Sequence, residues 1–96
     1  MQPSQILALK RNEVLALTAR SKARNVRVFG SARRGDDKEG SDLDLLVDAL
    51  PGATLFDLGA LHAELETLLG INVDLMTPSD LPLKYRDKVL AEAQPV

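Results

Sequence analysis

The sequence predicts a small α/β (α+β) domain in which helices pack on one face of a small mixed β-sheet. Three observations support this prediction. The chain has 96 residues, of which 45% are hydrophobic and 27% charged, a composition typical of globular domains. At this length folding buries about two-thirds of the unfolded chain's surface, which is enough for one modest core. Stretches of helical and strand periodicity also alternate along the chain. We therefore expect a single domain over residues 1–96.

The first part of the chain predicts a helix, a short strand and a loop. Ser4 can cap a helix that runs to about Lys22. The inward side of this helix is formed by apolar residues, Ile6, Leu7, Val14 and Leu17. Residues 25–29 (NVRVF) are rich in β-formers and end at Gly30, which predicts a strand. Residues 35–40 (GDDKEG) predict a polar loop.

The middle of the chain predicts a second strand and a capped helix. Residues 42–48 (DLDLLVD) have the pattern of a strand, and the proline–glycine pair at 51–52 stops it. Thr54 then caps a helix, with Asp57 three residues on as a weak capping box, and Gly70 closes the helix. Its apolar positions follow a 3.6-residue period: Leu58, Leu61, Leu65, Leu68 and Leu69.

The end of the chain predicts a third strand and a final helix. Residues 72–76 (NVDLM) form the strand, and Pro82 suits the first turn of the helix. The second and third strands are joined through a helix, so they are neighbours by a right-handed crossover if they are parallel. Helices on one face leave the opposite face of the sheet free to carry a site.

Residue usage excludes several kinds of chemistry. The chain has no cysteine, which excludes disulfides, thiol nucleophiles and zinc–thiolate sites. A single histidine, His62, excludes a multi-histidine metal site, and its place on the polar side of a helix indicates a surface residue. The apolar runs are too short to span a bilayer, and residues 1–13 lack the pattern of a signal peptide. We expect a cytoplasmic protein with no membrane association.

Charge is unevenly distributed along the chain. Residues 1–34 contain eight Lys or Arg and one acidic residue, whereas residues 35–96 contain four and thirteen. Two interpretations remain open: a basic region that meets a polyanionic partner, or solvated helix faces. Only three aromatic residues are available to stack on bases, Phe29, Phe56 and Tyr85, which argues against direct nucleic-acid binding.

Three aspartates are candidate ligands for a divalent cation. Side chains alternate along a strand, so Asp42 and Asp44 project to the same side, about 6–7 Å apart. Asp74 occupies the corresponding side of the third strand and converges with them if the strands lie in register. Hard oxygen ligands suit Mg²⁺ or Mn²⁺, which complete their shells with water and phosphates. The alternative is that these aspartates only mark half-exposed strands.

A candidate phosphate site precedes these strands. Gly30 and Ser31 follow the first strand, and a glycine there lets backbone amides approach an anion closely. If a helical turn begins after Ser31, its N-terminal end adds to the attraction. The Ser31 hydroxyl, with Arg33 or Arg34, supplies further anion contacts.

Together these residues read Gly30-Ser31-x₁₀-Asp42-x-Asp44, with Asp74 in a later strand. This pattern resembles the signature of the DNA polymerase β-like nucleotidyltransferase superfamily, and its brevity resembles the minimal nucleotidyltransferase (MNT) group. The resemblance covers nearly the whole chain and implies the polymerase β-like nucleotidyltransferase fold. One departure is Ala32, which stands where many MNT sequences carry a basic residue.

The resemblance implies a two-metal transfer of AMP from ATP, with two Mg²⁺ ions expected and Mn²⁺ as the alternative. It makes Asp42, Asp44 and Asp74 both metal ligands and catalytic residues, and Asp74 also orients or deprotonates the attacking hydroxyl. It assigns nucleotide binding to the turn and the basic residues after it: Gly30, Ser31, Arg33 and Arg34.

The acceptor is expected to come from another protein, because the catalytic elements leave no residues for an acceptor domain. In this respect the chain resembles the antitoxins of HEPN/MNT toxin–antitoxin pairs, which implies a HEPN-domain toxin as partner and a toxin tyrosine as acceptor. The alternative is a non-catalytic antitoxin that neutralises its toxin by binding and masking it. Transfer to a small molecule, such as an antibiotic, is a third possibility. The sequence leaves open the nucleotide, the acceptor residue, the oligomeric state and activity without a partner.

Overall fold

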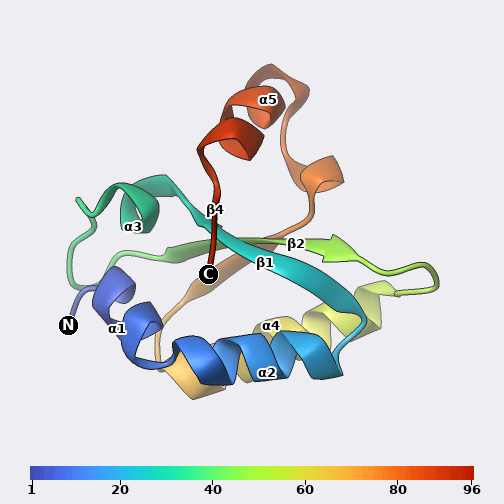
Figure 1. Ribbon diagram of the computed structural model, residues 1–96, viewed down its shortest axis with the longest axis horizontal. Helices are drawn as coiled ribbons and strands as arrows, with labels where there is room; N and C mark the ends of the chain where they lie inside the picture. The colour runs from blue at the N-terminus through green and yellow to red at the C-terminus, as the bar shows by residue number, and fades with distance from the viewer.

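The computed structural model describes residues 1–96 as a four-stranded sheet with helices on both sides (Figure 1). Its elements, in chain order, are α1 (Pro3–Leu9), α2 (Arg11–Arg20), β1 (Ala23–Phe29), α3 (Gly30–Arg34), β2 (Leu43–Ala49), α4 (Leu55–Leu69), β3 (Val73–Met76), the 3₁₀ turn η1 (Pro78–Asp80), α5 (Leu83–Glu92) and β4 (Gln94–Pro95). None of these helices combines the length and hydropathy that a membrane span requires.

The sheet is mixed, as the sequence predicts. The strand order is β3-β2-β1-β4. β1 pairs antiparallel with β2 and with β4, and β2 pairs parallel with β3. The crossover from β2 to β3 passes through α4, whose bounds match the prediction because the Thr54–Asp57 capping box starts the helix and Gly70, with φ of 69°, ends it.

The main core lies between the sheet and the helices α2 and α4. The inward side chains of β2, Leu43, Leu45 and Val47, are fully buried. They belong to one apolar cluster with the buried leucines of α4 and with Val14 of α2. Figure 1 shows α2 and α4 on the same side of the strands. This core fixes which face β2 turns outward, and that face carries Asp44.

The other face of the sheet is partly covered by the C-terminal segment. Leu46 points away from the main core, yet it has no exposed surface, and Leu81 after η1 is only 4% exposed. Figure 1 shows α5 on the opposite side of the strands from α2 and α4. The open part of this face is therefore smaller than the sequence indicated, and it lies toward the Asp44 end of β2.

The predicted N-terminal helix is two helices, α1 and α2, interrupted at Lys10. The predicted cap was also wrong, because Gln2 is the N-cap of α1. Ser4 instead donates from its backbone N and its Oγ to the carboxylate of Asp37, at 2.7 and 2.8 Å. Asp37 is only 2% exposed, so this pairing satisfies a buried carboxylate and draws α1 toward the loop before β2.

Two further differences concern the strands. β1 starts at Ala23 rather than at residue 25, and its pairing with β2 shifts register between Arg24 and Arg27. Asn25 adopts a φ of 58° at this irregularity. The two-residue strand β4 was not predicted, because a proline such as Pro95 argues against a strand. The proline is tolerated here because β4 lies at the edge of the sheet, where a missing amide breaks no ladder hydrogen bond.

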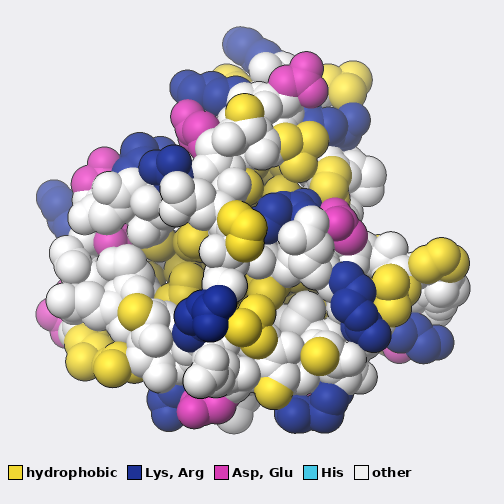
Figure 2. All heavy atoms as spheres, viewed as in Figure 1, with side chains coloured by type: hydrophobic (Ala, Val, Ile, Leu, Met, Phe, Trp, Pro, Cys, Tyr) yellow, Lys and Arg dark blue, Asp and Glu magenta, His cyan; other side chains and the backbone are white.

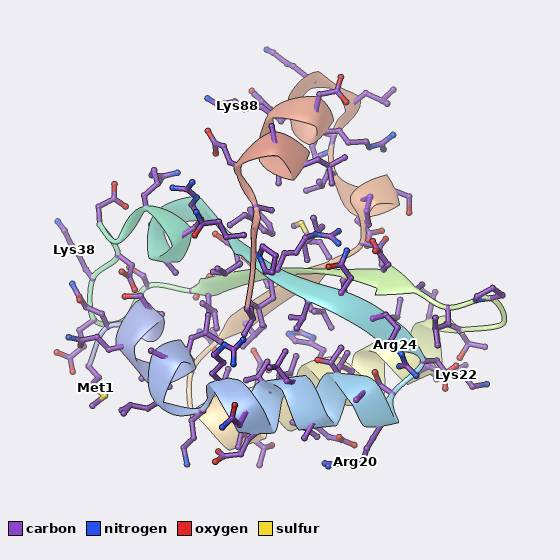
Figure 3. All side chains as sticks on the ribbon, viewed as in Figure 1. Met1, Arg20, Lys22, Arg24, Lys38 and Lys88 are labelled. Atoms are coloured by element: carbon purple, nitrogen blue, oxygen red, sulfur yellow. The ribbon has the colours of Figure 1, made fainter.

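The basic residues of the first third of the chain do not form one surface. Figure 3 shows Arg20, Lys22 and Arg24 near the junction of α2 and β1, at the far end of the molecule from α3 and its arginines. Figure 2 shows Lys and Arg side chains scattered around this face among acidic and apolar groups. This arrangement favours the interpretation that these charges are solvated helix and strand ends.

Candidate active site

Two carboxylates lie on adjacent strands at one end of the sheet. The parallel register of β2 and β3 pairs Asp44 with Asp74, so the two side chains project to the same face. Asp44 is half-buried and Asp74 is exposed. Asp42, which was predicted as part of the strand, lies just before β2 and is exposed. The structure thus brings Asp44 and Asp74 together, with Asp42 at the margin.

Gly30 lies directly against the Asp44 carboxylate. A Cβ added to Gly30 would lie 2.2 Å from Oδ2 of Asp44, so no larger residue fits without moving that carboxylate. Gly30 also has a φ of 71°, a left-handed conformation that favours glycine. The pairing of Phe29 with Asp44 explains the contact, because the chain leaves β1 beside this carboxylate. The glycine therefore brings the start of α3 into contact with the acidic pair.

The residues of α3 face different directions. At 100° per residue, Gly30 and Arg34 lie about 40° apart on this helical turn, and the charge of the exposed Arg34 acts on Asp44. Ala32 is 8% exposed and packs in the core, which explains why no basic residue stands there. Arg33 donates from Nε to the backbone carbonyl of Glu92, at 2.9 Å. Of the two predicted arginines, the structure places Arg34 toward the acidic pair and Arg33 toward the end of α5.

The acidic pair perturbs the pKa of Asp44. The pKa of this carboxyl is raised from 3.8 to about 6, and burial is the largest cause. The charge of Asp74, a hydrogen bond with Asp74 and the charge of Asp42 add to this increase, whereas the Arg34 guanidinium opposes it. A half-buried carboxylate beside a second one is a place where a cation would be strongly favoured.

The three aspartates are not gathered as a preformed metal site. No group of three or more His, Cys, Asp or Glu side chains is positioned to hold a metal ion. The expected convergence extends to Asp44 and Asp74, while Asp42 is exposed and acts on Asp44 through its charge. The donor set still suits Mg²⁺ or Mn²⁺, since these ions take one or two protein carboxylates and complete their shells with water and phosphate oxygens.

Comparison with known proteins decides the family. The model of the nucleotidyltransferase domain matches residues 13–96. The chain belongs to the nucleotidyltransferase domain family. The protein adenylyltransferase MntA of Thermococcus cleftensis is 42% identical over 76 residues, which cover 79% of this chain and 77% of the relative.

Two solved structures support the same conclusion at the level of the fold. A "putative minimal nucleotidyltransferase" superposes with a TM-score of 0.88 and 46% identity, covering 100% of this chain and 97% of its own. A chain from a toxin–antitoxin crystal structure with AMP-PNP superposes with a TM-score of 0.70 over 91% of this chain and 69% of its own. At 22% identity, this second likeness is one of fold. The resemblance drawn from the sequence motif is confirmed, and the chain is a nucleotidyltransferase enzyme.

Sequence reasoning missed the side chains that hold β3 in this nucleotidyltransferase. His62 Nε2 donates to the carbonyl oxygen of Val73 at 2.5 Å, and Glu66 Oε2 accepts from the Val73 amide at 2.9 Å. Both side chains project from α4 onto the outer edge of β3, directly before Asp74. His62 is thus half-exposed but has a structural partner. The only sequence signal is the four-residue spacing of His62 and Glu66, which does not identify the strand that they contact.

Asp48 illustrates a carboxylate that the site does not use. It lies two residues beyond Leu46 on the same face of β2, and its carboxylate accepts from Arg27 NH2 at 3.1 Å and from Asn25 Nδ2 at 3.0 Å. These hydrogen bonds lower the pKa of Asp48 below its usual value of 3.8. The pKa values of Asp44 and Asp48 are therefore shifted in opposite directions: burial and neighbouring carboxylates dominate at Asp44, and hydrogen bonds from Arg27 and Asn25 dominate at Asp48.

We expect Asp44→Asn and Asp48→Asn to have opposite pH-dependent effects on the stability of the metal-free enzyme. The folded chain holds the Asp44 proton up to about pH 6, whereas the unfolded chain releases it near 3.8. Ionised Asp44 therefore destabilises the fold above pH 6, and this penalty is lost as the pH falls toward 4. Compared with the wild type, Asp44→Asn should therefore raise the free energy of unfolding more at pH 7 than at pH 4, by on the order of 1 kcal/mol.

Asp48→Asn should do the reverse, because a lowered pKa stabilises the fold above pH 3.8 and this contribution is lost at lower pH. Urea unfolding at pH 4 and pH 7 measures the Asp44 effect, and unfolding at pH 2.5 and pH 4 measures the Asp48 effect, in both cases with a chelator present. The same pH dependence for the two variants would contradict this description of the site.

We expect Gly30→Ala to damage the site more than the fold. Gly52 has a φ of 86° and open space around it, so Gly52→Ala carries the backbone strain alone, about 1–2 kcal/mol. Gly30→Ala carries similar strain and also displaces the Asp44 carboxylate. Mn²⁺ affinity, measured by titration, should fall at least about tenfold in Gly30→Ala and stay unchanged in Gly52→Ala. Equal Mn²⁺ affinity in the two variants would contradict the predicted role of Gly30.

Proposed function

We propose that this nucleotidyltransferase transfers AMP from ATP to a hydroxyl of another protein, a tyrosine of a HEPN-domain toxin, and so acts as an antitoxin. The observation that carries the proposal is the contact of the Asp44 carboxylate with Gly30, beside Asp74 and at the start of α3. It places carboxylates that favour a cation next to a turn that carries backbone amides and the Ser31 hydroxyl. Transfer of a nucleotidyl group needs both parts within one site.

The relatives support the choice of nucleotide and acceptor. The Thermococcus cleftensis relative is named a protein adenylyltransferase, which favours AMP as the transferred group and a protein as the acceptor. The fold is shared with a chain solved in a toxin–antitoxin complex with AMP-PNP, an analogue of ATP. The HEPN identity of the toxin follows from the resemblance drawn from the sequence motif.

Different residues of the site would bind the triphosphate and the cation. Gly30 and Ser31 would hold the triphosphate through backbone amides and the Ser31 hydroxyl. Arg34, with its side chain 52% exposed, would add positive charge to the same side of α3. Asp44 and Asp74, joined by Asp42, would hold Mg²⁺, or Mn²⁺ in its place. When bound, the cation supplies acidification of the acceptor hydroxyl and charge neutralisation of pyrophosphate.

The proposed reaction is a displacement at the α-phosphorus of ATP. The acceptor hydroxyl oxygen forms a new bond to this phosphorus. The bond between the α-phosphorus and the oxygen that bridges the α- and β-phosphates breaks. Pyrophosphate leaves with that electron pair. The Asp74 carboxylate takes the proton of the acceptor hydroxyl, while Asp44 keeps Asp74 oriented from the neighbouring strand.

A masking antitoxin is the second candidate, and exposed apolar side chains favour it. Leu55 and Phe56 at the start of α4 are 87% and 90% exposed, and Leu83 in α5 is 81% exposed. Such side chains can bind a toxin whether or not the carboxylates react. The two functions differ in whether neutralisation needs Asp42 and Asp44.

The proposal is tested by mixing the enzyme, Mg-ATP and a HEPN toxin, and weighing the toxin by mass spectrometry. We expect the toxin to gain the mass of one or more adenylyl groups on tyrosine. The double variant Asp42→Asn/Asp44→Asn should lower the rate at least about 100-fold while still binding the toxin. Asp48→Asn makes the same chemical change on the same face of β2 and should leave the rate unchanged.

Three outcomes are informative. Adenylylation that the double variant abolishes supports the transferase. Neutralisation of the toxin by the double variant, with no mass added by the wild type, supports masking. Transfer to the toxin that survives in the double variant would contradict the assignment of the site.

A further inference from the structure

The two arginines of α3 have different surroundings. Arg34 is 52% exposed, forms a 3.4 Å ion pair with the exposed Asp36, and lowers the pKa of Asp44 by its charge. Arg33 is half-buried, and its Nε points to the carbonyl of Glu92, 59 residues later in the chain. One arginine therefore faces the acidic pair, and the other faces the C-terminal segment.

Arginine side chains attach the helix α5 to its neighbours at both of its ends. No residue of α5 is buried, and Figure 3 shows its Lys88 at the outer side of this helix, away from the sheet. Within α5, Arg86 donates to the carbonyl oxygens of Ser79 and Leu81, at 3.1 and 2.9 Å, which ties the helix to the segment around η1. The Arg33 bond ties the opposite end of the helix to α3.

Beyond α5 the chain returns to the sheet. β4 pairs with β1, and the Val96 amide donates to the carbonyl of Val26 at 3.0 Å. Figure 1 shows β4 running from the end of α5 back across β1. The carbonyl of Glu92 lies at the last turn of α5, where helix carbonyls have no partner within the helix. Arg33 satisfies this group and joins α3, α5 and β4 at one point.

We propose that Arg33 is a positioning residue and that, of the two arginines, only Arg34 contacts the nucleotide phosphates. The bond from Arg33 to Glu92 fastens the C-terminal segment to α3 and so holds the Gly30–Ser31 turn against Asp44. The assignment of Arg34 rests on the proposed function, whereas the attachment made by Arg33 does not. This division differs from the sequence-based expectation that both arginines bind the nucleotide.

The chemistry of the Arg33 bond allows a sharp test. The donor is Nε, and in glutamine the amide nitrogen Nε2 stands at the same place along the side chain. Arg33→Gln therefore keeps a donor for Glu92 and removes the positive charge. Arg33→Lys keeps the charge and puts a methylene where the donor was. The matched variants Arg34→Gln and Arg34→Lys test the same substitutions one residue away.

Two measurements are made on the full chain: amide hydrogen exchange of Ala93 and Val96 without nucleotide, and Mg-ATP binding by calorimetry. We expect Arg33→Lys to speed exchange at these amides about fivefold and to weaken ATP binding by a similar factor. Arg33→Gln should stay within about twofold of the wild type in both. Arg34→Gln should weaken ATP binding about tenfold or more without changing exchange, and Arg34→Lys should retain most of the affinity.

The reverse pattern would overturn the proposal. If Arg33→Gln weakens ATP binding as much as Arg34→Gln, then Arg33 is a phosphate ligand. If the exchange of Ala93 and Val96 is the same in Arg33→Lys and Arg33→Gln, the attachment through Glu92 is wrong. If the wild-type enzyme binds no ATP, the proposed function fails, but the exchange rates still decide the role of Arg33.

Discussion

The close contact between the Asp44 carboxylate and the backbone of Gly30 is the constraint on which the rest of the site depends. β1 ends beside Asp44, and the chain leaves the sheet at Gly30. The Asp44 carboxylate occupies the space that a side chain at position 30 would need. Only a residue without Cβ and with a left-handed φ fits there. The same turn starts α3 and presents its first amides beside the carboxylates. The groups proposed to bind phosphate and a cation are thus adjacent because of one steric requirement.

The elements around this contact are held by side chains that bond to backbone groups. The core beneath the sheet fixes the face on which Asp44 lies and includes Val73 of β3, but no residue of α5 is buried in it. Side-chain hydrogen bonds to backbone carbonyls and amides add to these contacts: His62 and Glu66 bond to β3, and Arg33 and Arg86 attach the two ends of α5. A half-buried, negatively charged site needs such support, because its own carboxylates repel each other.

Local patterns predicted most of the fold, and long-range contacts account for what they missed. The capping box at Thr54, the glycine at 70 and the alternation around Asp44 are properties of neighbouring residues, and each was confirmed. The different role of Ser4 follows from its bonds to Asp37, 33 residues away in the chain, and the short strand β4 follows from its pairing with the distant strand β1. In the site, Gly30 and the aspartates belong to a motif, whereas the different partners of Arg33 and Arg34 depend on where α5 ends.

The most direct test of the central claim is a crystal structure of the enzyme with Mn²⁺ and a non-hydrolysable ATP analogue, with the ion located by anomalous scattering. The account predicts an ion bound by oxygens of Asp44 and Asp74, and a triphosphate on the amides of Gly30 and Ser31. A structure in which the ion avoids Asp44, or in which the triphosphate lies away from the start of α3, would contradict it.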